Sequence, residues 1–121
     1  MKTFPVKNSL DGRLIAFEVE NAYIGPSTVA RLLRQVEGVS NVERRRPFSG
    51  SSDIHVRFKH GGHSCIVWEP YGDNSRYWIG PESPDTFPQD MRFVESVFDE
   101  YRPPMHRAVL GNLLSLRFFN R

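Results

Sequence analysis

The chain has little cysteine, no long apolar run and no strong excess of either charge. A single cysteine in 121 residues cannot form an internal disulfide, which excludes the disulfide-rich class of small secreted domains. No apolar run approaches the roughly 20 residues that a membrane-spanning helix requires. The first residues, Met1 to Lys7, lack the apolar core and cleavage site of a signal peptide. Together these absences predict a cytoplasmic protein that does not associate with membranes.

Lysine is scarce although basic residues are not. The net charge of +2 is too small to indicate nucleic-acid binding by itself. Arginine supplies every one of the 16 basic residues except Lys2, Lys7 and Lys59. Its planar guanidinium pairs with carboxylate or phosphate groups and stacks on aromatic rings, which suits an interaction surface. A GC-rich genome would produce the same enrichment, so both explanations stay open.

The overall composition is that of a globular chain. Hydrophobic residues make up 39% of it and charged residues 25%, both within the range of folded domains. Aromatic residues at 12% argue against disorder over most of the length. A chain of this size suits a single hydrophobic core. We expect a compact α+β domain over residues 1–104, followed by an apolar C-terminal helix over residues 105–121.

Apolar periodicity predicts the element order β-α-β-β-β-β-α-α. A short crossover through the first helix would make its two flanking strands parallel, whereas tight turns make the later strands antiparallel. The predicted architecture is a mixed or mainly antiparallel sheet of about five strands with helices packed on one face. Residues 1–13 are polar and contain only a turn signal, Asn8 to Gly12. The predicted strands cover Leu14 to Asn21, Ser40 to Arg46 and three segments between Asp53 and Gly80, and the helices cover Gly25 to Gly38, Pro88 to Tyr101 and Met105 to Arg121.

The segment from Asp53 to Gly80 predicts two adjacent hairpins, with turns at Gly61-Gly62 and at Pro70 to Asn74. An even-length loop suits the Gly-Gly pair, whereas a three-residue loop with a bulge would exchange the two faces of the hairpin. With the even loop, Phe58 opposes Cys65, Val56 opposes Val67, Arg57 faces Ile66 and His55 faces Trp68.

Aromatic and arginine side chains gather on the outer face of these strands. Platforms of this kind anchor protein partners or stack nucleic-acid bases. The alternative is that they pack beneath a helix, and residues 105–121 are the candidate to cover them, from the same chain or from a partner. The candidate binding residues are Arg57, His55, Trp68, Arg76, Trp78 and Tyr71.

Two further groups of residues have both a functional and a purely structural interpretation. Arg44 to Arg46 suit contact with phosphates, or a solvated edge strand whose charges block edge-to-edge pairing. His60, His63 and Cys65 are of metal-ligand and nucleophile type, but no fourth ligand lies nearby. A cysteine inside an apolar strand is more often a small buried side chain. No metal, cofactor or catalytic residue is therefore predicted.

The leading hypothesis is a protein-interaction module or small inhibitor-type partner that acts by binding rather than by catalysis. Single-stranded nucleic-acid binding through the sheet aromatics and arginines is one alternative. A small enzyme with a nucleophilic pair of Cys65 and histidine is another. The apolar residues 105–121 further predict self-association as a homodimer, because most soluble oligomers are symmetric.

Overall fold

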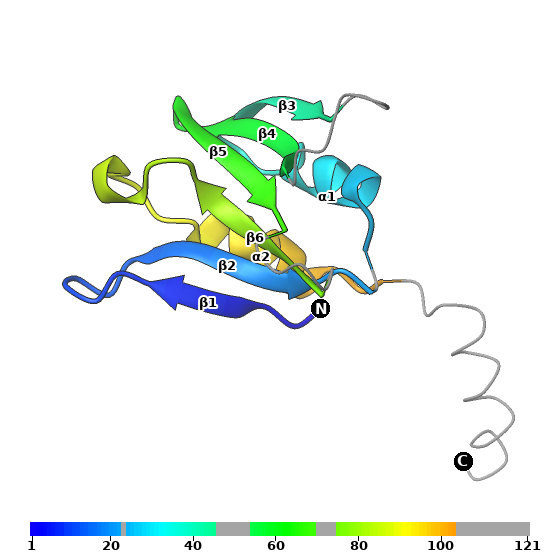
Figure 1. The fold of residues 1–121 in the computed structure, drawn as a ribbon, viewed down its shortest axis with the longest axis horizontal. Coiled ribbons are helices and arrows are strands. Elements are labelled where there is room, and N and C mark those ends of the chain that lie inside the picture. Colours follow the sequence, from blue (N-terminus) through cyan, green and yellow to red (C-terminus); the bar gives the residue numbers. More distant parts are fainter. Residues whose placement is uncertain (23, 46–53, 70–74, 104–121) are drawn as a thin grey trace, which may run out of the picture.

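The computed structural model describes residues 1–22, 24–45, 54–69 and 75–103, which form one sheet and its helices (Figure 1). The predicted helix over residues 105–121 lies outside these ranges, as does Tyr71. The elements, in chain order, are β1 (Phe4–Lys7), β2 (Leu14–Glu20), α1 (Pro26–Leu33), β3 (Val39–Arg44), β4 (Ile54–His60), β5 (His63–Trp68), β6 (Arg76–Pro81), the 3-10 helix η1 (Pro84–Thr86) and α2 (Arg92–Glu100).

The six described strands lie in the order β1-β2-β6-β5-β4-β3, and every neighbouring pair is antiparallel. The α+β class is therefore confirmed, and the sheet is antiparallel rather than mixed. β2 and β3 do run in the same direction, as a crossover through α1 requires. They are not neighbours, however, because β6, β5 and β4 lie between them.

β1 is the strand that the sequence analysis did not predict. Phe4 and Val6 are its only half-buried side chains, so its apolar pattern is short. It forms an edge of the sheet and has β2 as its one neighbouring strand. A proline such as Pro5, which lacks an amide hydrogen, is tolerated at such an edge. The turn after it is closed by a hydrogen bond of 2.8 Å from the Asn8 amide to the Arg13 carbonyl. The turn signal at Asn8 to Gly12 was thus the visible sign of a hairpin.

Both helices are shorter than their predicted spans but keep their apolar stripes. α1 begins at Pro26, where the missing amide hydrogen of proline removes no helical hydrogen bond. It ends at Leu33 and the chain then turns through Gly38, whose φ of 92° is left-handed. α2 begins at Arg92, four residues after the predicted Pro88, and the prolines beyond residue 102 prevent its continuation.

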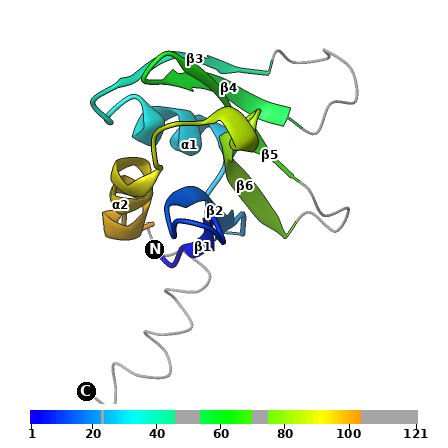
Figure 2. The same cartoon turned by 90° about the vertical axis from the view of Figure 1, so that its left-hand side faces the viewer.

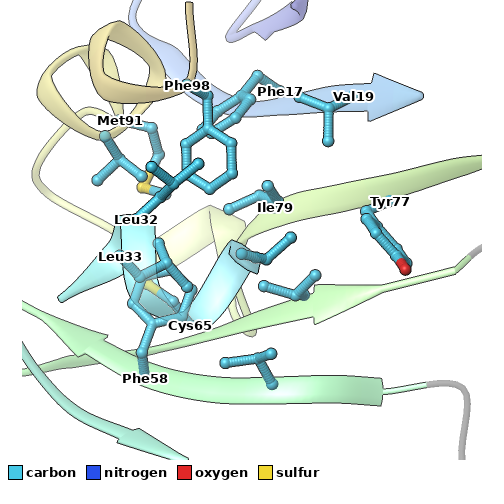
Figure 3. Close-up of a cluster of buried hydrophobic side chains, with 14 of the residues drawn as sticks. Phe17, Val19, Leu32, Leu33, Phe58, Cys65, Tyr77, Ile79, Met91 and Phe98 are labelled. Carbon is cyan, nitrogen blue, oxygen red and sulfur yellow. The ribbon is translucent and has the colours of Figure 1, made fainter. Parts of the chain in front are cut away.

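α1 and α2 pack on the same face of the sheet (Figure 2). The core lies between this face and the helices, and Figure 3 shows Phe17 of β2 meeting Phe98 of α2. Their ring centroids are 5.3 Å apart. Among the described residues, no helix covers the opposite face, which we call the open face. Neither described helix is long and apolar enough to cross a membrane.

Candidate functional site

The first hairpin has the register that the even-length loop predicts. Phe58 pairs with Cys65, Val56 with Val67 and Arg57 with Ile66. Gly61 and Gly62 have φ values of 57° and 83°, the left-handed pair that a two-residue hairpin turn requires. The expected assignment of faces therefore holds along most of the hairpin.

His55 is the exception, and its predicted pairing with Trp68 is wrong. Ile54 pairs with Trp68 instead, and the register shifts between Ile54 and Val56 because His55 is the extra residue of a β-bulge. A bulge redirects the side chain of the inserted residue. The imidazole consequently contacts the ring of Tyr77 on the helix side of the sheet, with centroids 5.5 Å apart. His55 is therefore separated from the other candidate binding residues.

The bulge forms a small polar cluster of His55, Glu69 and Tyr77 at the end of the sheet. His55 Nε2 pairs with the Glu69 carboxylate, and both side chains are only 15% exposed. Burial, with a smaller contribution from the Glu69 carboxylate, raises the pKa of Tyr77 to about 12. The cluster therefore has the arrangement of a hydrogen-bonded structural pair beside a buried phenol.

A row of side chains crosses the open face from one strand to the next. The pairing places Ile54 beside Trp68, Trp68 beside Trp78, Trp78 beside Glu18 and Glu18 beside Phe4. Directly opposed side chains in antiparallel strands lie on the same face and within contact distance. We call these five residues the open-face row.

The two tryptophans are the centre of the open-face row. Their rings meet edge to face with centroids 6.0 Å apart, an arrangement that aromatic pairs favour. Trp68 is 37% exposed, whereas Trp78 is half-buried. Gly80 makes room for Trp78, because a Cβ atom at residue 80 would lie 2.9 Å from the indole Cη2.

Arg76 is held within the open face by two partners. Its Nη1 donates to Glu18 Oε1 at 3.0 Å, and its guanidinium lies 3.7 Å from the centroid of the Phe4 ring. Glu18 is only 9% exposed, so Arg76 compensates a nearly buried carboxylate. Phe4 was missed as a site residue because β1 was not predicted, whereas Glu18 lies on the predicted strand β2 and its pairing with the distant Arg76 has no local signal.

Arg57 lies beside Ile66 and is more accessible. Its Nη1 donates to Glu82 Oε1 at 3.3 Å, and both side chains are largely exposed. An exposed pair of this kind stabilises the fold by at most about 1 kcal/mol. It is therefore readily exchanged for a pair with a ligand. The open face thus carries two arginines, each with a carboxylate, around an aromatic centre.

The other groups considered from the sequence do not join this site. Arg44 ends the edge strand β3 and Arg45 is exposed, while Arg46 lies outside the described residues.

Cys65 is buried in the core, and its thiol donates to the His63 carbonyl at 3.5 Å. Burial raises the pKa of this thiol to about 12, which argues against a nucleophilic thiolate. In the described parts of the chain, no three His, Cys, Asp or Glu side chains are grouped as metal ligands.

A polar hollow of ≈ 260 Å³ lies at the Gly61-Gly62 end of the hairpin. His63 and Phe87 meet edge to face there, with centroids 5.8 Å apart. The hollow is shallow and small compared with typical ligand pockets of about 300–1,000 Å³. It is lined by Gly62, His63, Ser64, Pro81, Glu82, Ser83, Thr86 and Phe87.

Comparisons of the chain with protein-family models, curated proteins and solved structures gave no match. The function must therefore be inferred from the surface that the fold presents.

Proposed function

We propose that this chain is a protein-interaction module that binds a protein partner through the open face of its sheet. The observation that carries the proposal is the edge-packed pair of exposed Trp68 and half-buried Trp78 on a sheet face that no described helix covers. Tryptophan is enriched among the residues that dominate binding energy at protein interfaces. Its position at the centre of the open-face row matches the usual place of such residues.

The charges around the tryptophans favour a protein over a nucleic acid. Arg76 is paired with Glu18, and Arg57 with Glu82, so the arginines do not form a one-sign patch. Nucleic-acid affinity depends mainly on uncompensated basic groups that replace counterions on phosphates. Paired charges around an apolar centre instead resemble the polar rim of a protein interface. A small inhibitor of the protein that it binds is one kind of such a module.

The test uses the full chain against a displayed library of folded domains and peptides. Binders selected on the wild-type chain are compared on Trp68→Ala and on Leu10→Ala. Leu10 is an exposed apolar residue on the turn between β1 and β2, outside the open-face row, so it is the matched control. We expect Trp68→Ala to weaken binding by at least about 30-fold, since truncating a dominant interface residue costs about 2 kcal/mol or more.

Circular dichroism and melting of both variants establish that they remain folded. Binders that recognise Trp68→Ala and wild type equally would overturn the proposal. A second arm measures binding of a mixed single-stranded oligonucleotide pool at low and high salt. Tight binding that weakens steeply with salt would replace the protein partner by nucleic acid.

A further inference from the structure

Phe93 is an aromatic side chain on α2 that the fold leaves uncovered. It is 71% exposed, whereas Val94 and Phe98 of the same helix are fully buried. With Val97 and Tyr101, which are partly buried against the edge of the core, it forms a stripe at i, i+4 and i+8 beside the fully buried stripe. α2 therefore has a second apolar side.

This second side forms one wall of a groove between α1 and α2, which we call the helix groove. Two hollows, of ≈ 340 Å³ and ≈ 230 Å³, share Gln35 and Val97 and so follow one another along it. Phe93 lines the first hollow and Tyr101 lines the second. The helix groove thus runs along the side of α2 from its first turn to the residue that follows it.

The chain leaves α2 at one end of the helix groove. Tyr101 follows the last helical residue, and its ring lies 5.8 Å from the guanidinium carbon of Arg31 on α1. Residues 101–104 have the length of the two- to five-residue loop of an αα-hairpin. A helix over residues 105–121 would be roughly 25 Å long, against about 14 Å for α2. If antiparallel to α2, it would reach Phe93.

The charges of the segment and the groove are complementary. Residues 105–121 contain Arg107, Arg117 and Arg121 and no Asp or Glu. Glu37 lines the hollow at Phe93, and Glu100 lines the hollow at Tyr101 together with Arg31, so the charged groups that line the groove are two carboxylates and one guanidinium. The apolar side chains of this segment surround most of a helix, so a helix here requires a surface to pack against.

We propose that residues 105–121 bind in the helix groove of their own chain, as a third helix antiparallel to α2 that covers Phe93 and Val97. The sheet separates this groove from Trp68 and Trp78, so the open face stays free for a partner. The proposal does not depend on the function assigned to the open face.

Amide hydrogen exchange of the full chain tests the proposal. We expect protected amides within residues 109–118 of the wild type. Phe93→Asp should accelerate exchange of these amides by at least about tenfold and leave the β5 and β6 amides unchanged. The matched control is Leu10→Asp, because Leu10 is 94% exposed on the distant β1–β2 turn. This control should leave the protection of residues 109–118 intact.

Two outcomes would overturn the proposal. One is a wild-type segment that exchanges without protection. The other is protection that survives Phe93→Asp. If Trp68→Asp instead releases the segment, residues 105–121 cover the open face, and both this proposal and the proposed function fail. Loss of protection with Phe93→Asp alone supports the groove and leaves the function at the open face to its own test.

Disulfide trapping distinguishes the chain's own segment from that of a second copy. Gln35→Cys, at the middle of the helix groove, is combined in turn with cysteine at residues 109, 110, 113 and 114. Cys65 is fully buried and does not compete. We expect an intramolecular disulfide for at least one pair, and none when Leu10→Cys replaces Gln35→Cys. Only intermolecular disulfides, or none, would overturn the assignment and favour a homodimer or another location.

Discussion

Two buried ionisable side chains, Cys65 and Tyr77, are accepted by the fold only in their neutral forms. Burial raises the pKa of each to about 12, against ordinary values of 9.0 for the thiol and 10.0 for the phenol. Both side chains belong to the buried cluster of the core (Figure 3). The thiol is thus a small packing group, as a cysteine inside an apolar strand usually is.

We expect the free energy of unfolding to fall as the pH rises above about 9. The unfolded chain releases the thiol and phenol protons near their ordinary pKa values, whereas the folded chain holds them up to about pH 12. The unfolded state therefore binds fewer protons in this window, and stability decreases by about 1.4 kcal/mol per pH unit for each fully titrating group.

Urea unfolding at a series of pH values measures this slope. A variant with Cys65→Val and Tyr77→Phe lacks both groups and should lose most of the dependence. An unchanged slope in that variant would assign the effect to other residues.

Gly80 matters for the space it leaves rather than for its backbone. A Cβ atom at this position would lie 2.7 Å from the Cβ of Ala16 and 2.9 Å from Trp78 Cη2. We expect Gly80→Ala to destabilise the protein by about 1–3 kcal/mol, because extra atoms displace packed neighbours. The near-ultraviolet circular dichroism of the tryptophans should change with it.

The double variant Ala16→Gly with Gly80→Ala is the control, because it removes one of the two close contacts. Partial recovery of stability is expected. Equal stability of Gly80→Ala and wild type would mean that Trp78 does not lie against this glycine.

At the scale of elements, α2 has one side in the core and another in the helix groove. Phe98 is fully buried and packs against Phe17, whereas the next residue, Asp99, is exposed. We expect Phe98→Ala to cost about 3–5 kcal/mol of stability, the usual loss for a core phenylalanine. Asp99→Ala, one residue along the same helix, should change stability by less than about 0.5 kcal/mol. Chemical denaturation of both variants checks the difference, and similar losses would contradict the assigned helix face.

In the hairpin of β4 and β5, local sequence patterns predict the register of most residues but not the bulge at His55. The alternation of apolar residues and the Gly61-Gly62 turn act over a few residues, so they determined the register up to Val56. The bulge at His55 depends on Glu69 and Tyr77, which are distant along the chain. Such contacts between distant residues leave no periodic signal. One candidate site residue was therefore assigned to the wrong face.

At the scale of the molecule, the sequence predicted the class and the packing of α1 and α2 on one face, but not the full sheet. The apolar stripes of α1 and α2 were recognisable because burial of one side of a helix gives a period of 3.6 residues. β1 was not predicted because only one side of this edge strand is half-buried, which leaves little apolar alternation in its sequence. Because β1 was not predicted, Phe4, one of the two partners of Arg76, was not among the candidate site residues.

The strand order also determines how the chain must fold. β3, β4, β5 and β6 follow one another along the chain and across the sheet, and β1 and β2 form a second hairpin. Among the described strands, these two units are joined by the pairing of β2 with β6, for example Phe17 with Ile79. Such distant pairing requires the closure of a long loop, which slows folding. During synthesis, the edge of β2 must therefore wait for β6, and its apolar face must wait for α2, whose Phe98 packs on Phe17.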